Sequence, residues 1–256
     1  MPPFQGTARA MSSDGLSTVA DLVGTHATEL FTVLAVETKG CGFLPDQRPQ
    51  ILYERHIFSR LTSGAFDDGD ISDPKPGGYG ASGAHQYGRL NAAIAKNRAA
   101  ALQSASWGIG QVMGENFAAA GFSDVEAMVS SMMLNEDEQL TAMANFLLNN
   151  KLATPLRSHD WATFARGYNG KDFAINKYDV NLNAEFQKLS ISGVPDLVVR
   201  AAQLYLIYLG FDPHGVDGVA GKNTLSALAD FQNANGFPVT TSIDAATVTQ
   251  LQNALA

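Results

Sequence analysis

The segment Leu30–Gly40 carries a helical apolar stripe that ends on a carboxylate. Four of its residues follow the i, i+3, i+4, i+7 spacing that puts side chains on one face of an α-helix: Leu30, Val33, Leu34 and Glu37. Gly40 is a stop signal, so Glu37 is expected in the last helical turn. Burial and the negative end of the helix dipole both raise the pKa of such a carboxyl. The segment predicts a helix whose Glu37 is either a proton donor near neutral pH or a structural carboxylate at the helix end.

Helical periodicity recurs along the first 189 residues, which we expect to form one mainly α domain. Residues 1 to about 15 lack periodicity and are expected to be a loose arm, and residues 51–58 fit either a strand or a helix. Helices are expected over Ser17–Glu37, Tyr87–Ser104 and Glu136–Asn150, and from a Ser158 cap through Arg166.

The composition changes after Leu189. Residues 190–195 resemble a short linker, and residues 196–256 contain no Glu, five Asp, one Arg and one Lys, which gives a charge of 2 − 5 = −3. Three short helices are expected at about 196–209, 224–234 and 244–254, separated by Gly-rich turns. This second part is predicted to be a small three-helix bundle, near the size limit for folding alone.

Charge and composition exclude several classes of protein. The net charge of −8 argues against a nucleic-acid partner, which requires a basic surface. No stretch approaches the roughly 20 apolar residues of a membrane span, so we expect no membrane anchor. The first ten residues lack an apolar signal core, so we expect synthesis in a cytoplasm without a signal peptide. The single Cys41 excludes an intrachain disulfide framework.

Other enzyme chemistries do not fit the sequence. Cys41 follows a helix C-terminus, where the dipole disfavours a thiolate nucleophile. The five histidines show no zinc-ligand spacing, and no Gly-x-Ser-x-Gly elbow surrounds a serine. The loop Asp67–Gly83 has four Asp, but twelve positions from Asp68 end on Tyr79, not on the Glu of a calcium loop. We therefore expect neither a metal nor another cofactor.

Three motifs occur in the order found in the lysozyme superfamily. Residues 36–40 resemble its helix-end glutamate motif. Residues 106–113 resemble the Ser-x-Gly-x-x-Gln segment of goose-type lysozymes and lytic transglycosylases, and residues 165–170 are similar to their Ala-Tyr-Asn element with Arg-Gly inserted. The matching positions after Glu37 are Ser106, Gly108, Gln111, Tyr168 and Asn169.

The run Gln50–Arg60 and the Gly-rich loop after it look more closely like the N-acetylmuramidase domain of phage endolysins. The resemblance covers about residues 20–189 and implies a lysozyme-like helical domain with a small β-hairpin region. It implies cleavage of the β-1,4 bond between N-acetylmuramic acid and N-acetylglucosamine, with Glu37 as the general acid.

The resemblance assigns the remaining residues to substrate binding. Gly108 allows close backbone approach, and Gln111 offers a donor and an acceptor to an N-acetyl group. Ser106 and Tyr168 would position the sugar and the acid, and Asn169 would hydrogen-bond the carboxyl or cap a turn.

Glu54 is the candidate second carboxylate, because the resemblance covers its segment and its neighbours are apolar. It would activate water as a base or pair with a cation such as Arg55. A separation of about 6.5–9.5 Å from Glu37 would fit inversion, and about 5 Å retention. Mobile-loop alternatives are Asp67, Asp68, Asp70 and Asp73.

The second part resembles the peptidoglycan-binding domain family over nearly all of residues 196–256. The resemblance rests on Val199–Leu204, Leu209–Phe211, Val216–Thr224, Phe231–Gln232 and Gly236–Phe237. A wall-binding groove around Asp217, Gly218 and Thr224 is a guess from this motif.

The sequence thus predicts a monomeric endolysin with domains at 1–189 and 196–256, whose partner is bacterial peptidoglycan and which reaches the wall after holin release. Two alternatives stay open. One is a lytic transglycosylase that leaves 1,6-anhydromuramyl ends. The other is a non-catalytic wall-binding structural protein of a phage.

Overall fold

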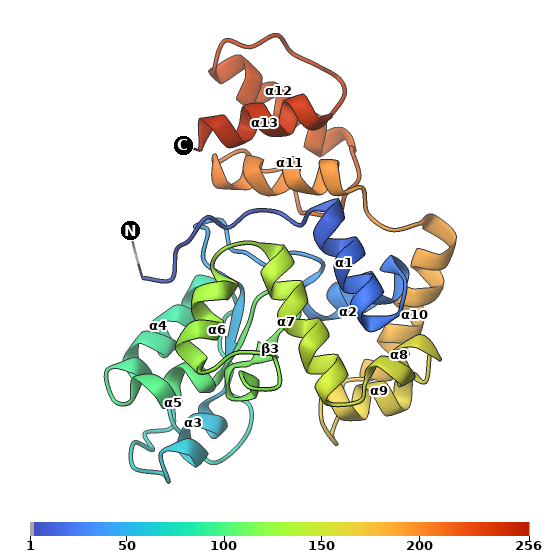
Figure 1. Ribbon diagram of the computed structural model, residues 1–256. Coiled ribbons are helices and arrows are strands. Elements are labelled where there is room, and N and C mark those ends of the chain that lie inside the picture. The colour runs from blue at the N-terminus through green and yellow to red at the C-terminus, as the bar shows by residue number, and fades with distance from the viewer. Residues whose placement is uncertain (1–2, 256) are drawn as a thin grey trace.

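The computed structural model describes residues 3–255 as a mainly helical chain with one small sheet, as the sequence predicts (Figure 1). The large domain has the helices α1 Ser13–Val23, α2 Ala27–Thr38, α3 Arg55–Leu61, α4 Ala84–Ile94, α5 Arg98–Gln103, α6 Val125–Met132, α7 Glu136–Asn149, α8 Ala153–Arg157, α9 Trp161–Tyr168 and α10 Tyr178–Ser192, with a 3-10 turn η1 at Gly114–Asn116. The C-terminal module has α11 Leu197–Tyr208, α12 Lys222–Ala234 and α13 Ala245–Ala254. The strands are β1 Ile51–Tyr53, β2 Ala105–Trp107 and β3 Val112–Met113.

Local capping residues set the helix boundaries more finely than periodicity does. Gly24 ends α1 in the left-handed conformation, with φ of 69°, and α2 leaves at 104° to α1. The expected single stretch Ser17–Glu37 is therefore two helices. Tyr87–Ser104 is likewise split into α4 and α5, because Asn97 caps a new helix by accepting a hydrogen bond from the backbone N–H of Ala100.

The cap predicted at Ser158 is wrong. Asp160 caps α9 by accepting a hydrogen bond from the backbone N–H of Thr163 at 3.1 Å, and Ser158 follows the end of α8 instead. Both residue types can accept from a helix N-terminus. The sequence pattern alone did not distinguish them.

The three strands form one antiparallel sheet in the order β1-β2-β3. Ile51 pairs with Trp107, and Ser106 pairs with Met113. The ambiguous run of residues 51–58 is thus a strand followed directly by α3. In Figure 1, α3 to α6 lie to one side of this sheet and α8 to α10 to the other, with α7 between them.

The core of the large domain surrounds β2 and α2. Trp107 is fully buried, and its indole N–H donates to the carbonyl of Leu102 at 3.1 Å. Leu30, Val33 and Leu34 on the α2 stripe are also fully buried, as their spacing predicts. This packing fixes the end of α2 relative to the sheet.

The predicted loose arm at the N-terminus is wrong for the residues that the structure describes. Ala8 is fully buried, and its carbonyl accepts a hydrogen bond from the Tyr208 hydroxyl at 3.0 Å. The backbone N–H of Ala10 donates to the Tyr205 hydroxyl at 3.1 Å. The segment before α1 therefore runs between the large domain and α11 (Figure 1).

The C-terminal module has its own apolar core, which includes Leu206, Leu228, Phe231 and Leu251. Its three helices correspond to the three that the sequence predicts. Ser190–Ser192, at the start of the predicted linker, instead continue α10. A short segment, residues 193–196, therefore joins α10 to α11.

The module is held against the large domain by a buried ion pair. Arg200 on α11 lies 3.1 Å from Glu136 at the start of α7, and the two side chains are 1% and 0% exposed. Arg200 also donates to the carbonyl of Gly40, just beyond α2. Phe43, Leu204 and Val216 belong to a small apolar cluster at the interface between the module and the large domain, which we call the seam.

Within residues 3–255, no single helix is long and apolar enough to cross a membrane. Helices α1 and α2 reach that length and composition only as a strongly bent pair.

Candidate active site

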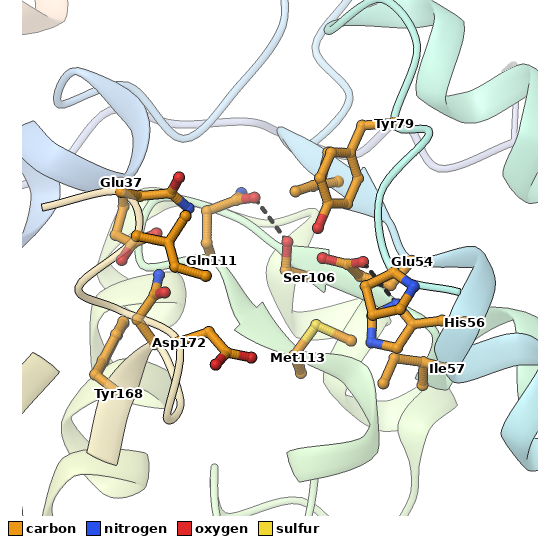
Figure 2. A pocket seen from close by; sticks show the side chains of 15 residues that line it. Glu37, Glu54, His56, Ile57, Tyr79, Ser106, Gln111, Met113, Tyr168 and Asp172 are labelled. Carbon is orange, nitrogen blue, oxygen red and sulfur yellow. Dashed lines mark hydrogen bonds and ion pairs between the residues drawn. The ribbon is translucent and has the colours of Figure 1, made fainter. Parts of the chain in front are cut away.

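A cavity of about 560 Å³ opens beside the sheet, between the end of α2, the start of α3 and the end of α9 (Figure 2). Both predicted carboxylates and most of the predicted binding residues line it. Its lining comprises Glu37, Leu52, Glu54, His56, Ile57, Pro76, Tyr79, Ser106, Gln111, Met113, Tyr168, Asn169, Asp172, Ile175 and Asn176.

Glu37 lies in the last turn of α2 and is half-buried in the cavity wall. Burial raises the pKa of its carboxyl to about 7, and a hydrogen bond from the Tyr178 hydroxyl opposes that shift. The carboxyl is thus substantially protonated at neutral pH and open to a ligand. These are the properties required of a general acid.

Glu54 stands on the opposite side of the cavity, at the junction of β1 and α3 (Figure 2). Its side chain is 15% exposed, and its Oε2 lies 3.1 Å from Nδ1 of His56. Burial raises the pKa of Glu54 to about 7, against a hydrogen bond from Tyr79 and the charge of Arg89. Burial and the charge of Arg60 lower the pKa of His56, so the Glu54–His56 pair carries little positive charge at neutral pH.

Ser106 and Gln111 form a fixed pair on the cavity floor. The Ser106 hydroxyl donates to Oε1 of Gln111 at 2.7 Å, and Nε2 of Gln111 donates to the carbonyl of Gly108 at 2.8 Å. Gln111 adopts a left-handed backbone conformation, with φ of 48°, at the end of the β2–β3 turn. These bonds fix the orientation of the amide, and one lone pair of Oε1 remains available to a ligand.

Gly108 is buried and does not line the cavity. Its φ is 71°, and a Cβ on it would lie 2.6 Å from the side-chain amide carbon of Gln139. The expected close approach of its backbone to a polysaccharide is therefore wrong. The glycine is required by packing against α7, and its carbonyl orients Gln111.

Tyr168 and Asn169 lie at the end of α9 and line the cavity beside Glu37. The Tyr168 hydroxyl donates to the carbonyl of Gly110, and its ring stacks on Phe164. Tyr168 thus contacts the turn before β3, whereas Tyr178 donates to the Glu37 carboxyl. The sequence did not single out Tyr178, which lies on α10, 141 residues after Glu37.

Asp172 and Tyr79 also line the cavity and were not singled out from the sequence. Asp172 follows the Tyr168–Asn169 motif, and Tyr79 lies in the Gly-rich loop. Each stands in a segment without periodicity, so no sequence pattern indicated which side chains would face inward. The nearby motif was the one available signal for Asp172.

The four loop aspartates, which the sequence offered as alternatives to Glu54, do not line the cavity. Their carboxylates stabilise the conformation of the loop through hydrogen bonds and ion pairs. Asp68 Oδ1 accepts backbone hydrogen bonds from residues 70–72, and Asp67 accepts from Ser72 at 2.5 Å. Asp73 pairs with Arg55 at 3.3 Å and Asp70 with Arg89 at 3.4 Å.

The motif residues of the C-terminal module surround a buried glutamine. Gln203 donates to Asp217 at 2.8 Å and to Thr224 at 3.0 Å, and accepts from the backbone N–H of Gly218 at 2.8 Å. Thr224 is 3% exposed. Thr224 therefore stabilises the loop from inside, whereas Asp217 and Gly218 line a cavity of about 440 Å³. The wall-binding role of the three residues stays a prediction.

Among residues 3–255, no three His, Cys, Asp or Glu side chains are grouped to hold a metal ion. Burial raises the pKa of the Cys41 thiol to about 12, with the charge of Glu136 adding to the shift. This side chain does not resemble an activated nucleophile.

The chain matches two families in tandem. The N-acetylmuramidase family model matches residues 26–190, which is more than half of the chain, and a peptidoglycan-binding domain model matches residues 195–251. The chain is also similar to the crystal structure of the Burkholderia AP3 phage endolysin, with 41% sequence identity and a TM-score of 0.64. That match covers 73% of each chain. No curated protein matches the chain.

The fold, the cavity and these matches agree. The chain belongs to the N-acetylmuramidase family, as a peptidoglycan hydrolase in which a muramidase domain is followed by a peptidoglycan-binding domain.

Proposed function

We propose that this protein is an endolysin in which Glu37 protonates the β-1,4 glycosidic oxygen between N-acetylmuramic acid and N-acetylglucosamine. One observation carries the proposal. The Glu37 carboxyl lines the cavity and its pKa is raised to about 7, so it can hold a proton near neutral pH.

The reaction divides between two walls of the cavity. As the bond from the anomeric carbon to the bridging oxygen breaks, the Glu37 proton moves to that oxygen, and the leaving sugar departs as an alcohol. Glu54 on the facing wall accepts a proton from the water that attacks the anomeric carbon. The two proton transfers leave Glu37 ionised and Glu54 protonated, and exchange with solvent restores both.

Three polar side chains orient the acid and the sugar, and a fourth supports the turn beside them. Tyr178 donates to the Glu37 carboxyl and fixes its rotamer. Ser106 holds the Gln111 amide in place for an N-acetyl group. Asn169 lines the same wall as Glu37 and is free to meet a sugar hydroxyl. Tyr168 supports the turn that carries Gly110.

We further propose that residues 1–189 carry the catalytic activity and residues 196–256 the affinity for the wall. The bulk charge of −8 offers no attraction to an anionic wall, so targeting rests on specific contacts. The protein acts on the wall of an infected bacterium, as a monomer.

Mass spectrometry of purified peptidoglycan after digestion tests the proposal. Fragments with reducing muramic acid ends are the expected product. Reducing glucosamine ends would contradict the assigned bond, and 1,6-anhydromuramyl ends would make the enzyme a lytic transglycosylase. Release of no fragment would leave a wall-binding structural protein.

A further inference from the structure

The Gly-rich loop before α4 brings Tyr79 to the wall of the active-site cavity that carries Glu54. Tyr79 is 39% exposed, and its hydroxyl points toward the Glu54 carboxyl (Figure 2). Burial raises the pKa of Glu54 to about 7, and the hydrogen bond from Tyr79 opposes that rise. The pKa of Tyr79 is raised in turn, by burial and by Glu54. Tyr79 thus stands to Glu54 as Tyr178 stands to Glu37 on the opposite wall.

The backbone of the loop does not fix the position of Tyr79 by itself. Residues 73–81 form neither a helix nor a strand. Gly77, Gly78 and Gly80 take positive φ angles of 94°, 68° and 67°. Glycine loses more conformational freedom than any other residue when its backbone is fixed. Contacts from outside the loop are therefore needed to hold Tyr79 in place.

Two buried side chains of α4 supply these contacts. Gln86 is 1% exposed, and its Nε2 donates to the carbonyls of Tyr79 at 2.7 Å and of Ala81 at 2.8 Å. Nη1 of Arg89 donates to the same Tyr79 carbonyl at 3.0 Å. The two donors occupy both lone pairs of that carbonyl. The backbone of Tyr79 is therefore fixed to α4.

The same glutamine also holds the strand that leads to Glu54. Oε1 of Gln86 accepts a hydrogen bond from the backbone N–H of Tyr53 at 2.9 Å, at the end of β1. Glu54 is the next residue, and its own N–H donates to the carbonyl of Ser104 at 2.8 Å. One buried amide thus joins the loop that carries the tyrosine to the strand end that carries the carboxylate.

The other charged groups around Glu54 do not fix the orientation of its carboxyl. Nδ1 of His56 lies 3.1 Å from Oε2 of Glu54, but neither atom forms a hydrogen bond within residues 3–255. Arg89 acts on Glu54 through its charge, which lowers the pKa of the carboxyl. Glu37 and Asp172 line the facing side of the cavity (Figure 2). The hydroxyl of the loop tyrosine is therefore the group placed to orient the carboxylate.

We propose that Tyr79 is a positioning residue for Glu54, and that Gln86 sets the place of both by joining the loop to the end of β1. The Tyr79 hydroxyl holds the Glu54 carboxylate in one orientation while that carboxylate accepts the proton of the attacking water. This inference deepens the proposed function and rests on the role of Glu54 as the base.

The pH profile of activity on soluble glycan strands tests the role of Tyr79. In Tyr79→Phe the acidic limb of the kcat/KM profile should move to higher pH by about half a unit to one unit, because the pKa of Glu54 rises when the hydrogen bond is lost. The value of kcat should fall about tenfold with KM nearly unchanged, since the substrate loses no contact. An alkaline limb that moves in place of the acidic one would overturn the role of Tyr79.

Tyr208→Phe is the matched control for this variant. It also removes one phenolic hydrogen bond, to the carbonyl of Ala8, but far from the cavity. Its pH profile should match that of the wild type. Movement of the acidic limb in this control as well would overturn the assignment, because loss of any tyrosine hydroxyl would then have the same effect.

Gln86→Met tests the buried amide. The acidic limb should move in the same direction, and Tyr79→Phe combined with Gln86→Met should move it no further than Tyr79→Phe alone, because both changes act through one hydrogen bond. Gln232→Met is the matched control, since it removes an equally buried amide that bonds Thr240 in the C-terminal domain. Limb movements that add in the double variant would overturn the role of Gln86.

Titration of the Glu54 carboxyl by carbon-13 NMR separates this inference from the proposed function. The resonance, assigned by its loss in Glu54→Gln, should titrate at a higher pH in Tyr79→Phe than in the wild type. Equal titration in the two proteins would overturn the role of Tyr79, whether or not the protein cleaves glycan. A shifted titration with an unmoved acidic limb would confirm the contact and contradict Glu54 as the base.

Discussion

Arg200 of the wall-binding domain and Glu136 of the muramidase domain form a fully buried ion pair, with two nitrogen–oxygen distances of 3.1 Å. Glu136 also accepts backbone hydrogen bonds from Met11 and Gly42, each at 2.9 Å. One carboxylate thus joins the N-terminal segment, the residues after α2 and the C-terminal domain. The two domains are coupled through it.

Arg200→Met should destabilise the protein strongly, because it leaves the Glu136 carboxylate buried without its cation. The expected loss in the free energy of unfolding is about 3–5 kcal/mol. Arg98→Met is the control, since its pair with Glu126 is half exposed and should contribute less than about 1 kcal/mol. Urea denaturation of both variants measures the difference, and equal midpoints would refute the coupling.

Deletion of residues 196–256 should lower the melting temperature of the remaining domain as well as its affinity for purified wall. The deletion exposes Phe43 and Ala8 and removes the partner of Glu136. Glu136→Gln in the truncated protein should restore part of the stability, because removal of the unpaired charge outweighs the loss of one of the two backbone hydrogen bonds that the carboxylate oxygens accept. A truncated domain that melts like the full chain would mean that the seam adds no stability.

Tyr178→Phe should shift the alkaline limb of the pH–activity profile to higher pH. The Tyr178 hydrogen bond lowers the pKa of Glu37, so its removal lets that pKa rise, by about one unit at most. The value of kcat should fall as well, because the acid loses its orientation. Tyr168→Phe is the control, since its hydroxyl donates to the Gly110 carbonyl. Identical profiles for Tyr178→Phe and the wild type would contradict the role of Tyr178.

Glu37→Gln should become more stable, relative to the wild type, as the pH rises from 5 to 8. The folded pKa of Glu37, about 7, exceeds its ordinary value of 4.5, so the stability tied to its protonation is complete below about 4.5 and is lost as the pH rises through 7. Glutamine stays neutral throughout. Between pH 5 and pH 8, the free energy of unfolding of Glu37→Gln should rise by about 2 kcal/mol relative to that of the wild type, after allowance for partial solvation of the carboxyl. Chemical denaturation of both proteins at the two pH values measures this difference. A difference that does not vary with pH would contradict the raised pKa.

Local signals in the sequence predicted the main features of the fold and part of the candidate site. The stripe that ends on Glu37 and the motif around Gln111 both rest on spacing within a few residues. The contact between Glu37 and Tyr178 depends on how α10 packs on α2, which no local pattern records. The prediction for Gly108 was wrong for a different reason. A glycine that is required by packing against Gln139 cannot be distinguished in the sequence from one that allows a ligand to approach.

The contacts between the two domains could not be predicted from the sequence either. Residues 8–10 carry no periodicity because they form neither a helix nor a strand of the main sheet, yet Ala8 is fully buried beneath α11. Arg200 and Glu136 lie 64 residues apart on separate helices, so their pairing is a tertiary property.

The assignment of Glu37 as the general acid is tested most directly by digesting purified peptidoglycan with the wild type, Glu37→Gln and Glu54→Gln at equal wall-bound concentration. Glu37→Gln should release fragments at least about 100-fold more slowly, with unchanged binding to the wall. Glu54→Gln should also be slower if it activates the water. Release at the wild-type rate by a folded Glu37→Gln protein would contradict the account.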